Sequence, residues 1–233
     1  GKDYLAGGIY AGWYALNLRG DNRDGLARRS VEDLTEFFLT GRNNATAAFG
    51  KMTDIIENST QYLTKEDAVA MARFIKSLPP KDPAKKPFKE DKTVARQLWK
   101  GDDGKTGAAV YLDSCAPCHK TDGSGYKRFF PELRGNPVVM SEDPVSLIHI
   151  TLMGQTLPGL KAAPSSITMP PFGWRLDDRQ IADVVTFIRS SWGNNASAAT
   201  VEEVRKMRAN KAFFPDPRIF GDSNVDKLLN RQY

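Results

Sequence analysis

The stretch Cys115-Ala116-Pro117-Cys118-His119 contains both cysteines and one of the two histidines of the chain. Its spacing, Cys-x-x-Cys-His, is that of a c-type haem attachment site. Two thiols on one turn of backbone can each add to a vinyl group of the porphyrin, and the imidazole that follows then lies beneath the iron as its proximal ligand. The stretch therefore predicts one covalent haem c on Cys115 and Cys118, with His119 as an iron ligand.

Two other chemistries use the same residue types. A structural zinc site needs four ligands, and His149 is the one further histidine or cysteine in the sequence. A thioredoxin-like redox pair has the same cysteine spacing, but it belongs to a βαβ context that the sequence does not show, and it gives His119 no role. Both are weaker alternatives to covalent haem. We interpret His149, in the middle of an apolar helical segment, as a structural residue.

Length and composition fit a globular protein with one large or two small domains. The chain has 233 residues, of which 40% are hydrophobic and 26% charged. The net charge of +5 arises from lysines and arginines scattered among carboxylates, so we expect no nucleic-acid partner. No apolar run is long enough to cross a bilayer. Thioether attachment of haem takes place outside the bacterial inner membrane, so the motif predicts a periplasmic protein.

The segment 79–92 divides the chain. Its sequence, PPKDPAKKPFKEDK, is rich in proline and lysine, so it is stiff and cannot bury a core, as is typical of a linker between domains. We therefore expect a first unit (residues 1–78), this linker, a second unit with the haem motif (residues 93–195) and a C-terminal extension (residues 196–233).

Helix signals occur in both units. In the first unit, a helix is expected after Ser30, with Gly41 just past its end, and another after Thr64, stopped by Pro79. Residues 1–29 show neither helical nor strand periodicity and are expected to form a loop over something apolar, and Met52 falls in a stretch expected to be irregular.

The second unit is expected to open with a helix over residues 106–114 that ends at the haem motif. Gly107 and Tyr111 share one face of this helix, where they could admit and pack against a crossing helix. A further helix is expected from Asp143 to Gly154 and a last core helix from Asp177.

The two units form a loose internal repeat. Leu18-Arg19-Gly20 matches Leu133-Arg134-Gly135. In each unit this tripeptide is followed first by a capped helix that ends at a glycine, then by a methionine, and then by a terminal helix. The repeat predicts an all-α protein of two tandem class I cytochrome c-like domains. The place of His119 in the repeat corresponds to Tyr4, with no cysteine or histidine nearby. We therefore expect an N-terminally incomplete piece of a multihaem protein, with a second haem in residues 1–78 if the missing motif precedes them.

The sixth iron ligand is expected to be a thioether, because methionine sulfur favours ferrous iron and raises the potential. Met169 is preferred because it lies in a proline-flanked loop directly before the last core helix, and Met52 holds the matching place in the first unit. The carbonyl of Pro131 is the expected acceptor for the other ring nitrogen of His119; Leu16 is its counterpart in the first unit. Three residues are candidates for contact with the haem propionates: Arg134, Arg19 and Trp174.

Several longer stretches resemble one known family, the cytochrome c subunits of membrane-bound alcohol dehydrogenases and their gluconate, sorbitol and fructose dehydrogenase relatives. The resemblance covers roughly residues 5–208. The stretches that carry it are Met169-Pro-Pro-Phe-Gly-Trp-Arg-Leu176, Phe187-Ile-Arg-Ser-Ser-Trp-Gly-Asn194, Thr40-Gly-Arg-Asn43, Ala47-Ala-Phe-Gly50 and Ser59-Thr-Gln-Tyr62.

The resemblance implies three class I cytochrome c domains, of which this chain holds the second without its attachment motif and all of the third. It also implies an electron-transfer subunit, not the catalytic one, at the outer face of the inner membrane. Such a subunit takes electrons from a quinoprotein or flavoprotein dehydrogenase and passes them to ubiquinone. Residues 209–233, with Phe213, Phe214 and Phe220, lie outside the resemblance and are expected to pack on a partner subunit or on the chain itself.

Two other functions stay open from the sequence. One is a free-standing periplasmic dihaem cytochrome c that serves a terminal oxidase, which would form only small, salt-sensitive contacts with its partners. The other is a dihaem peroxidase, which needs an iron with an open or displaceable sixth site. The stiff loop that carries Met169 favours a closed site and therefore electron transfer.

Overall fold

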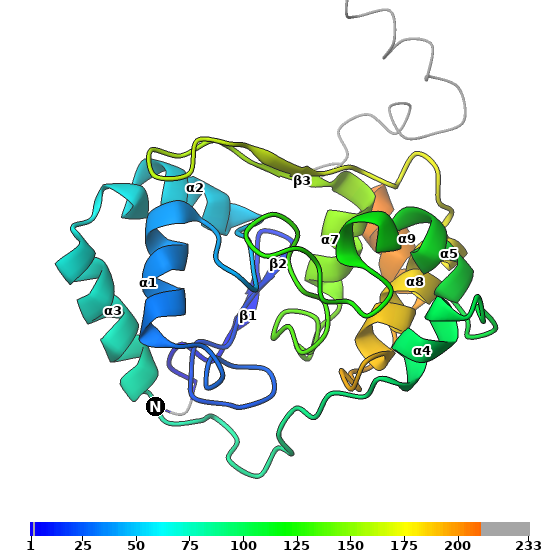
Figure 1. The fold of residues 1–233 in the computed structure, drawn as a ribbon, viewed down its shortest axis with the longest axis horizontal. Helices are drawn as coiled ribbons and strands as arrows, with labels where there is room; N and C mark the ends of the chain where they lie inside the picture. The colour runs from blue at the N-terminus through cyan, green and yellow to red at the C-terminus, as the bar shows by residue number, and fades with distance from the viewer. Residues whose placement is uncertain (2, 211–233) are drawn as a thin grey trace, which may run out of the picture.

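The computed structural model describes residues 1 and 3–210, and Figure 1 shows their arrangement. The aromatic residues expected to pack within residues 209–233, Phe213, Phe214 and Phe220, lie outside the described residues. Among the residues that are described, no helix has both the length and the apolar character needed to cross a membrane.

The first unit is built around two packed helices, α1 (Val31–Thr40) and α3 (Lys65–Ser77). Both begin where the sequence predicts, because the Ser30 and Thr64 side chains accept hydrogen bonds from backbone N–H groups in the first turn. Gly41 ends α1 in the left-handed conformation, with φ of 68°. The apolar faces of the two helices form the first core, which contains Leu26, Leu34, Phe38, Ala72 and Ile75.

Two expectations for the first unit were wrong. Residues 1–29 contain a short hairpin, β1 (Gly8–Tyr10) and β2 (Trp13–Ala15), whose turn at Ala11 and Gly12 has positive φ at both residues. Strands of three residues are too short to show alternation in the sequence. The region of Met52 is also regular: the described structure here is α2 (Lys51–Asn58) and the single 3₁₀ turn η1 (Thr60–Tyr62). Gly50 precedes α2 without a capping side chain, so the usual start signal is missing.

The second core lies in the second unit, where α5 (Ala108–Ser114) crosses α8 (Asp178–Ser190). Gly107 lies so close to the backbone oxygen of Asp183 that a Cβ could not fit, and the Tyr111 ring packs against Phe187 with centroids 5.2 Å apart. The predicted crossing helix is therefore α8. The helices around this core are α4 (Thr93–Trp99), α5 (Ala108–Ser114), α6 (Ala116–His119), α7 (Val145–Met153), α8 (Asp178–Ser190) and α9 (Val201–Ala209).

The second core extends past residue 195, where the sequence places the end of the second unit. Val204 and Met207 of α9 are buried against it, and α9 packs on both α7 and α8. Thr200 and Glu203 form a capping box at the start of α9, which is a start signal that the sequence contains. The part of the extension that the structure describes thus belongs to the second core.

Met169 lies in a strand, not in the loop that we expected. The strand β4 (Ile167–Met169) pairs antiparallel with β3 (Gln155–Leu157), and Gln155 lies opposite Met169. In Figure 1 this hairpin extends from the α7 side of the second unit towards α2 of the first. No strand signal is present in the sequence here, because each strand has only three residues and the prolines that follow Met169 are unusual in strands.

A third core joins the units. Leu157 and Leu160 of the hairpin are buried with Ala48 and Ile56 of the first unit. The hairpin backbone also reaches the first unit directly, because the N–H of Lys161 donates to the Gln61 side chain at 3.0 Å. The two units are therefore joined by apolar packing as well as by the linker.

The linker is also attached to the units by hydrogen bonds. The Asp21 carboxylate accepts from the backbone N–H groups of Lys81 and Asp82 at 2.7 and 2.8 Å. Further along, the N–H of Phe88 donates to the Asn22 side chain at 3.1 Å. An all-α class holds only in part, since helices dominate but the described residues also contain two small sheets.

Candidate functional site

The haem motif forms a sharp bend between two helices. Cys115 follows the last residue of α5 and precedes α6, which is a single turn with Pro117 near its start. The N–H of His119 donates to the Cys115 carbonyl at 2.9 Å, and Lys120 leaves the turn with φ of 61°. This turn directs both cysteines and His119 to one cavity.

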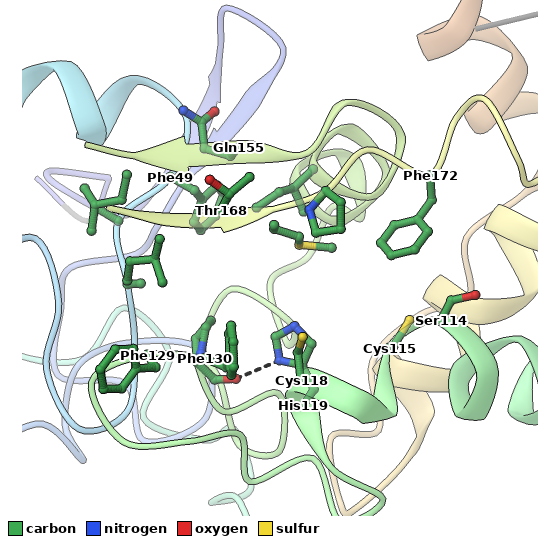
Figure 2. A pocket seen from close by; sticks show the side chains of 18 residues that line it. Phe49, Ser114, Cys115, Cys118, His119, Phe129, Phe130, Gln155, Thr168 and Phe172 are labelled. Atoms are coloured by element: carbon green, nitrogen blue, oxygen red, sulfur yellow. Dashed lines mark hydrogen bonds between the residues drawn. The ribbon is translucent and has the colours of Figure 1, made fainter. Parts of the chain in front are cut away.

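The cavity lies between two walls (Figure 2). Cys118, His119, Phe129 and Phe130 lie on one side, and the β3–β4 hairpin with Thr168 lies opposite them. Most of the lining side chains are apolar. They are Ala47, Ala48, Phe49, Ser114, Cys115, Cys118, His119, Phe129, Phe130, Pro131, Ile150, Gln155, Leu157, Ile167, Thr168, Met169, Pro170 and Phe172.

His119 is held in one tautomer. Its Nδ1 lies 2.9 Å from the Pro131 carbonyl oxygen, the contact expected from the sequence. A carbonyl can only accept, so Nδ1 carries the proton and Nε2 keeps its lone pair. Burial lowers the pKa of His119, and the Pro131 carbonyl only partly opposes this shift. The imidazole is therefore neutral near pH 7, the form that binds a metal.

Cys115 lies in surroundings that do not suit a redox thiol. Burial raises the pKa of the Cys115 thiol to about 12, and the nearby Cys118 adds to this effect. Redox cysteines need a lowered pKa, because the thiolate is the reactive form. Among residues 1 and 3–210, no group of three His, Cys, Asp or Glu side chains is placed to hold a metal ion, as a zinc site would require. The raised pKa of the Cys115 thiol therefore argues against a redox pair.

Of the methionines after the motif, Met169 is the one that lines this cavity. Met140, Met153 and Met207 instead belong to apolar packing or to other surfaces. Met52 is partly buried, packs against the first and third cores, and does not line the cavity of His119.

The side chains expected to contact propionates lie elsewhere. Arg134 pairs with Glu90 and Asp122 at 3.0 and 3.2 Å, and Arg19 donates to two backbone carbonyls of its own unit and the linker. Trp174 is half exposed, and none of these three residues lines the cavity.

The first unit contributes a wall that our sequence analysis missed. Ala47, Ala48 and Phe49 line the cavity of the second unit, and the N–H of Glu132 donates to the Ala45 carbonyl at 3.0 Å beside it. A short sequence likeness outside the order of the repeat was present, since Ala47-Ala-Phe-Gly50 resembles Pro170-Pro-Phe-Gly173, whose Pro170 and Phe172 line the same cavity. Sequence similarity between the segments does not reveal that they meet.

His149 joins the units through its ring. It stacks on Trp13 with centroids 3.9 Å apart and an interplanar angle of 11°, and its Nδ1 lies 2.9 Å from the Gly12 carbonyl oxygen. Trp13 also contacts Phe49 edge-on, with centroids 5.4 Å apart. These contacts agree with the structural role that the sequence predicts for His149.

The donor set fits haem c. Two thiols and a neutral imidazole follow each other on one turn, a thioether lies in the wall opposite, and the surroundings are apolar. Thiols add to vinyl groups, and imidazole and thioether are common axial ligands of haem iron.

Comparison with known proteins gives matches over most of the chain. The cytochrome c family model matches residues 104–192. The gluconate 2-dehydrogenase cytochrome c subunit of Pantoea cypripedii is 56% identical over 210 residues, which are 88% of this chain and 48% of that subunit. The quinone alcohol dehydrogenase cytochrome c subunit of Gluconobacter oxydans is 41% identical over 214 residues, which are 91% of this chain and 45% of that subunit.

A smaller relative matches only part of the chain. Cytochrome c-552 of Thermus thermophilus is 31% identical over 114 residues, which are 45% of this chain and 86% of that protein. By contrast, the chain spans about half the length of the two dehydrogenase subunits.

Proposed function

Because the chain belongs to the cytochrome c family, whose cofactor is covalently bound haem c, and has dehydrogenase cytochrome c subunits as close homologues, we propose that it is an electron-transfer subunit. In this function it accepts electrons from the catalytic subunit of a dehydrogenase and passes them towards ubiquinone. We place it in the periplasm, at the outer face of the inner membrane.

The observation that carries the proposal is the hydrogen bond between His119 and the Pro131 carbonyl. It fixes the proton on Nδ1 and leaves Nε2 available, while burial keeps the imidazole neutral in an apolar cavity that also contains two thiols and a thioether. Cys115 and Cys118 would form the thioether bonds, and His119 and Met169 would be the axial ligands. Bound haem c supplies reversible one-electron chemistry at its iron.

The surrounding residues favour electron transfer over catalysis at iron. Met169 of the β3–β4 hairpin would be the sixth ligand of bound haem iron, and the aromatic and aliphatic lining would limit access of water. A peroxidase would need that position open. Both hairpin strands are paired and their outer loop is packed in the third core, which holds Met169 in a fixed backbone.

The division into two cytochrome c-like domains is also part of the proposal. Each unit has its own helical core, and matched glycines, Gly41 and Gly154, end the first long helix of each. In this proposal Met52 is the axial ligand of a further haem in residues 1–78. Contact of Arg134 and Trp174 with the haem propionates stays a prediction, since neither side chain lines the cavity of His119.

Intact mass and spectroscopy test the haem site. We expect one covalent haem per Cys-x-x-Cys-His motif under denaturing conditions, and a methionine-to-ferric charge-transfer band in the oxidised protein. The control is a Cys115→Ser/Cys118→Ser variant, which should lose this haem. Absence of the haem from the unchanged protein would remove the basis of the proposal, and a missing charge-transfer band would favour the peroxidase class.

Reduction by a partner tests the function. The full protein should copurify with a dehydrogenase catalytic subunit, and substrate should reduce its haem within the complex and then a ubiquinone analogue. Gluconate and a primary alcohol are the two substrates to compare, because both types of dehydrogenase occur among the relatives. A short-lived, salt-sensitive association with no stable complex would instead indicate a free carrier.

A further inference from the structure

Arg42 is a buried cation without an adequate partner. Its side chain belongs to a residue that is 6% exposed, and its Nη1 is inaccessible and makes no hydrogen bond to the described residues. Burial lowers the pKa of Arg42, and the positive charge of Arg128 lowers it further. A buried guanidinium is costly unless an anion or acceptor satisfies it. Arg42 therefore points to an acceptor that the polypeptide does not supply.

Arg42 lies beside the cavity of His119. It forms an antiparallel bridge with Ala47, and its Cζ is 5.9 Å from the centroid of the Phe129 ring. Both Ala47 and Phe129 line the cavity. A guanidinium from the first unit is thus held against the wall of a site whose cysteines belong to the second.

The position of Arg42 and Phe129 along the cavity indicates which part of the haem would lie beside them. Figure 2 shows Phe129 at the opposite end of the cavity from Cys115. In haem c the two thioether bonds are made on one side of the macrocycle and the two propionates extend from the other. With the thioether side held by the cysteines, the carboxylates belong at the end where Phe129 lies.

The other nearby arginines are already occupied. Arg175 lies at the cysteine end, where it donates to Asp113 and Ser114. Arg128 is about half exposed and pairs with Glu36. Neither has the buried, unsatisfied donor that distinguishes Arg42.

We propose that Arg42 binds a propionate of the haem attached to Cys115 and Cys118, so that the first unit supplies part of the cofactor site of the second. The inference rests on the proposed haem site and adds a positioning residue to it. A charge-assisted hydrogen bond would satisfy Nη1 and neutralise the carboxylate. Since a nearby positive charge favours the reduced iron, Arg42 should raise the reduction potential.

The test measures this potential in the intact holoprotein. The potential that disappears in the Cys115→Ser/Cys118→Ser variant identifies the haem in question. Arg42→Gln should lower this potential and shift the propionate-bending band in resonance Raman spectra. The matched control is Arg128→Gln, which removes the same charge at a half-exposed position, where solvent screens it. It should leave both readouts near those of the unchanged protein.

A second variant protects the test against misfolding. Arg42→Lys keeps the positive charge but replaces the planar guanidinium by an ammonium group. Its reduction potential should therefore lie closer to that of the unchanged protein than the potential of Arg42→Gln does, while the propionate band should still shift. An unchanged propionate band in Arg42→Lys, or equal potentials in Arg42→Gln and Arg128→Gln, would overturn the inference. Failure of the haem site itself would appear separately, as loss of the haem mass from the unchanged protein.

Discussion

The two units place matched residues in different roles. Asp21 and Asn136 hold the same place after the repeated Leu-Arg-Gly. Asp21 accepts hydrogen bonds from the linker, whereas Asn136 bonds within its own loop, to the Glu132 carbonyl and the Val138 N–H. The residue after the repeated Leu-Arg-Gly thus attaches the linker in the first unit, whereas in the second unit it stabilises only its own loop.

The segments after Gly41 and Gly154 differ in the same way. In the first unit the backbone forms a single bridge, Arg42 with Ala47, and in the second it forms the longer β3–β4 hairpin. The short segment becomes a wall of the neighbouring cavity, and the long one reaches back to pack in the third core. Because the segment after Gly154 is longer than the segment after Gly41, it reaches the first unit, and each unit thus packs against the other.

The largest expected difference between the units concerns their methionines. Met169→Leu should abolish the methionine-to-ferric charge-transfer band of the haem at Cys115 and Cys118 and lower its potential, because leucine offers no sulfur ligand. Met52→Leu should leave that haem unchanged, since Met52 does not line its cavity. Near-infrared absorption and redox titration check both variants. Loss of this band in Met52→Leu instead would contradict our assignment.

Breaking the third core tests whether the units form one cooperative body. Leu157→Ala should cost about 3 kcal/mol of unfolding free energy, since it removes a buried side chain between the units. Chemical denaturation should also show the two units separating into distinct transitions. Met71→Ala, at an exposed position on α3, is the control and should have little effect. A single unchanged transition in Leu157→Ala would show that this core contributes little to the coupling between the units.

The matched helix-ending glycines should respond unequally. Gly154→Ala places a Cβ against the backbone of Met169 and Pro171 at φ of 64° and should cost about 3 kcal/mol. Gly41→Ala meets only Leu157 and Leu160 side-chain atoms, at 3.1 to 3.2 Å, and should cost about 1 kcal/mol. Thermal unfolding compares the two. Equal losses would mean that the hairpin backbone yields as easily as a leucine side chain.

The smallest expected effect is the contribution of Asp21 to linker attachment. Burial alone would raise its pKa, but hydrogen bonds from the N–H groups of Asp82 and Lys81 and from Asn17 lower it below 3.8 overall. A lowered folded-state pKa gives stability that is present above about pH 4 and is lost as the pH falls through the folded value.

Asp21→Asn should therefore destabilise the protein by about 1 kcal/mol at neutral pH, and the difference should disappear in acid. Denaturation at a series of pH values checks this, with Asn136→Asp as the reciprocal variant. If the stability difference between the unchanged protein and Asp21→Asn persisted below the folded-state pKa of Asp21, the packing of this side chain and not its charge would hold the linker.

The sequence by itself determined the local features of the protein. Ser30, Thr64 and Asp177 begin helices where their side chains bond to backbone N–H groups within one turn, and the spacing of Cys115 and Cys118 depends on a single turn. These interactions involve neighbours in the chain, so a pattern of residues is sufficient to predict them.

Only the tertiary structure decided which distant segments meet. That Phe49 lines the cavity of His119, that Leu157 is buried with Ile56, and that Arg42 lies beside Phe129 depend on packing between segments about 70 to 100 residues apart. Apolar burial is non-directional, so many pairings would satisfy the same hydrophobic pattern. The shape of the folded units selects one of them.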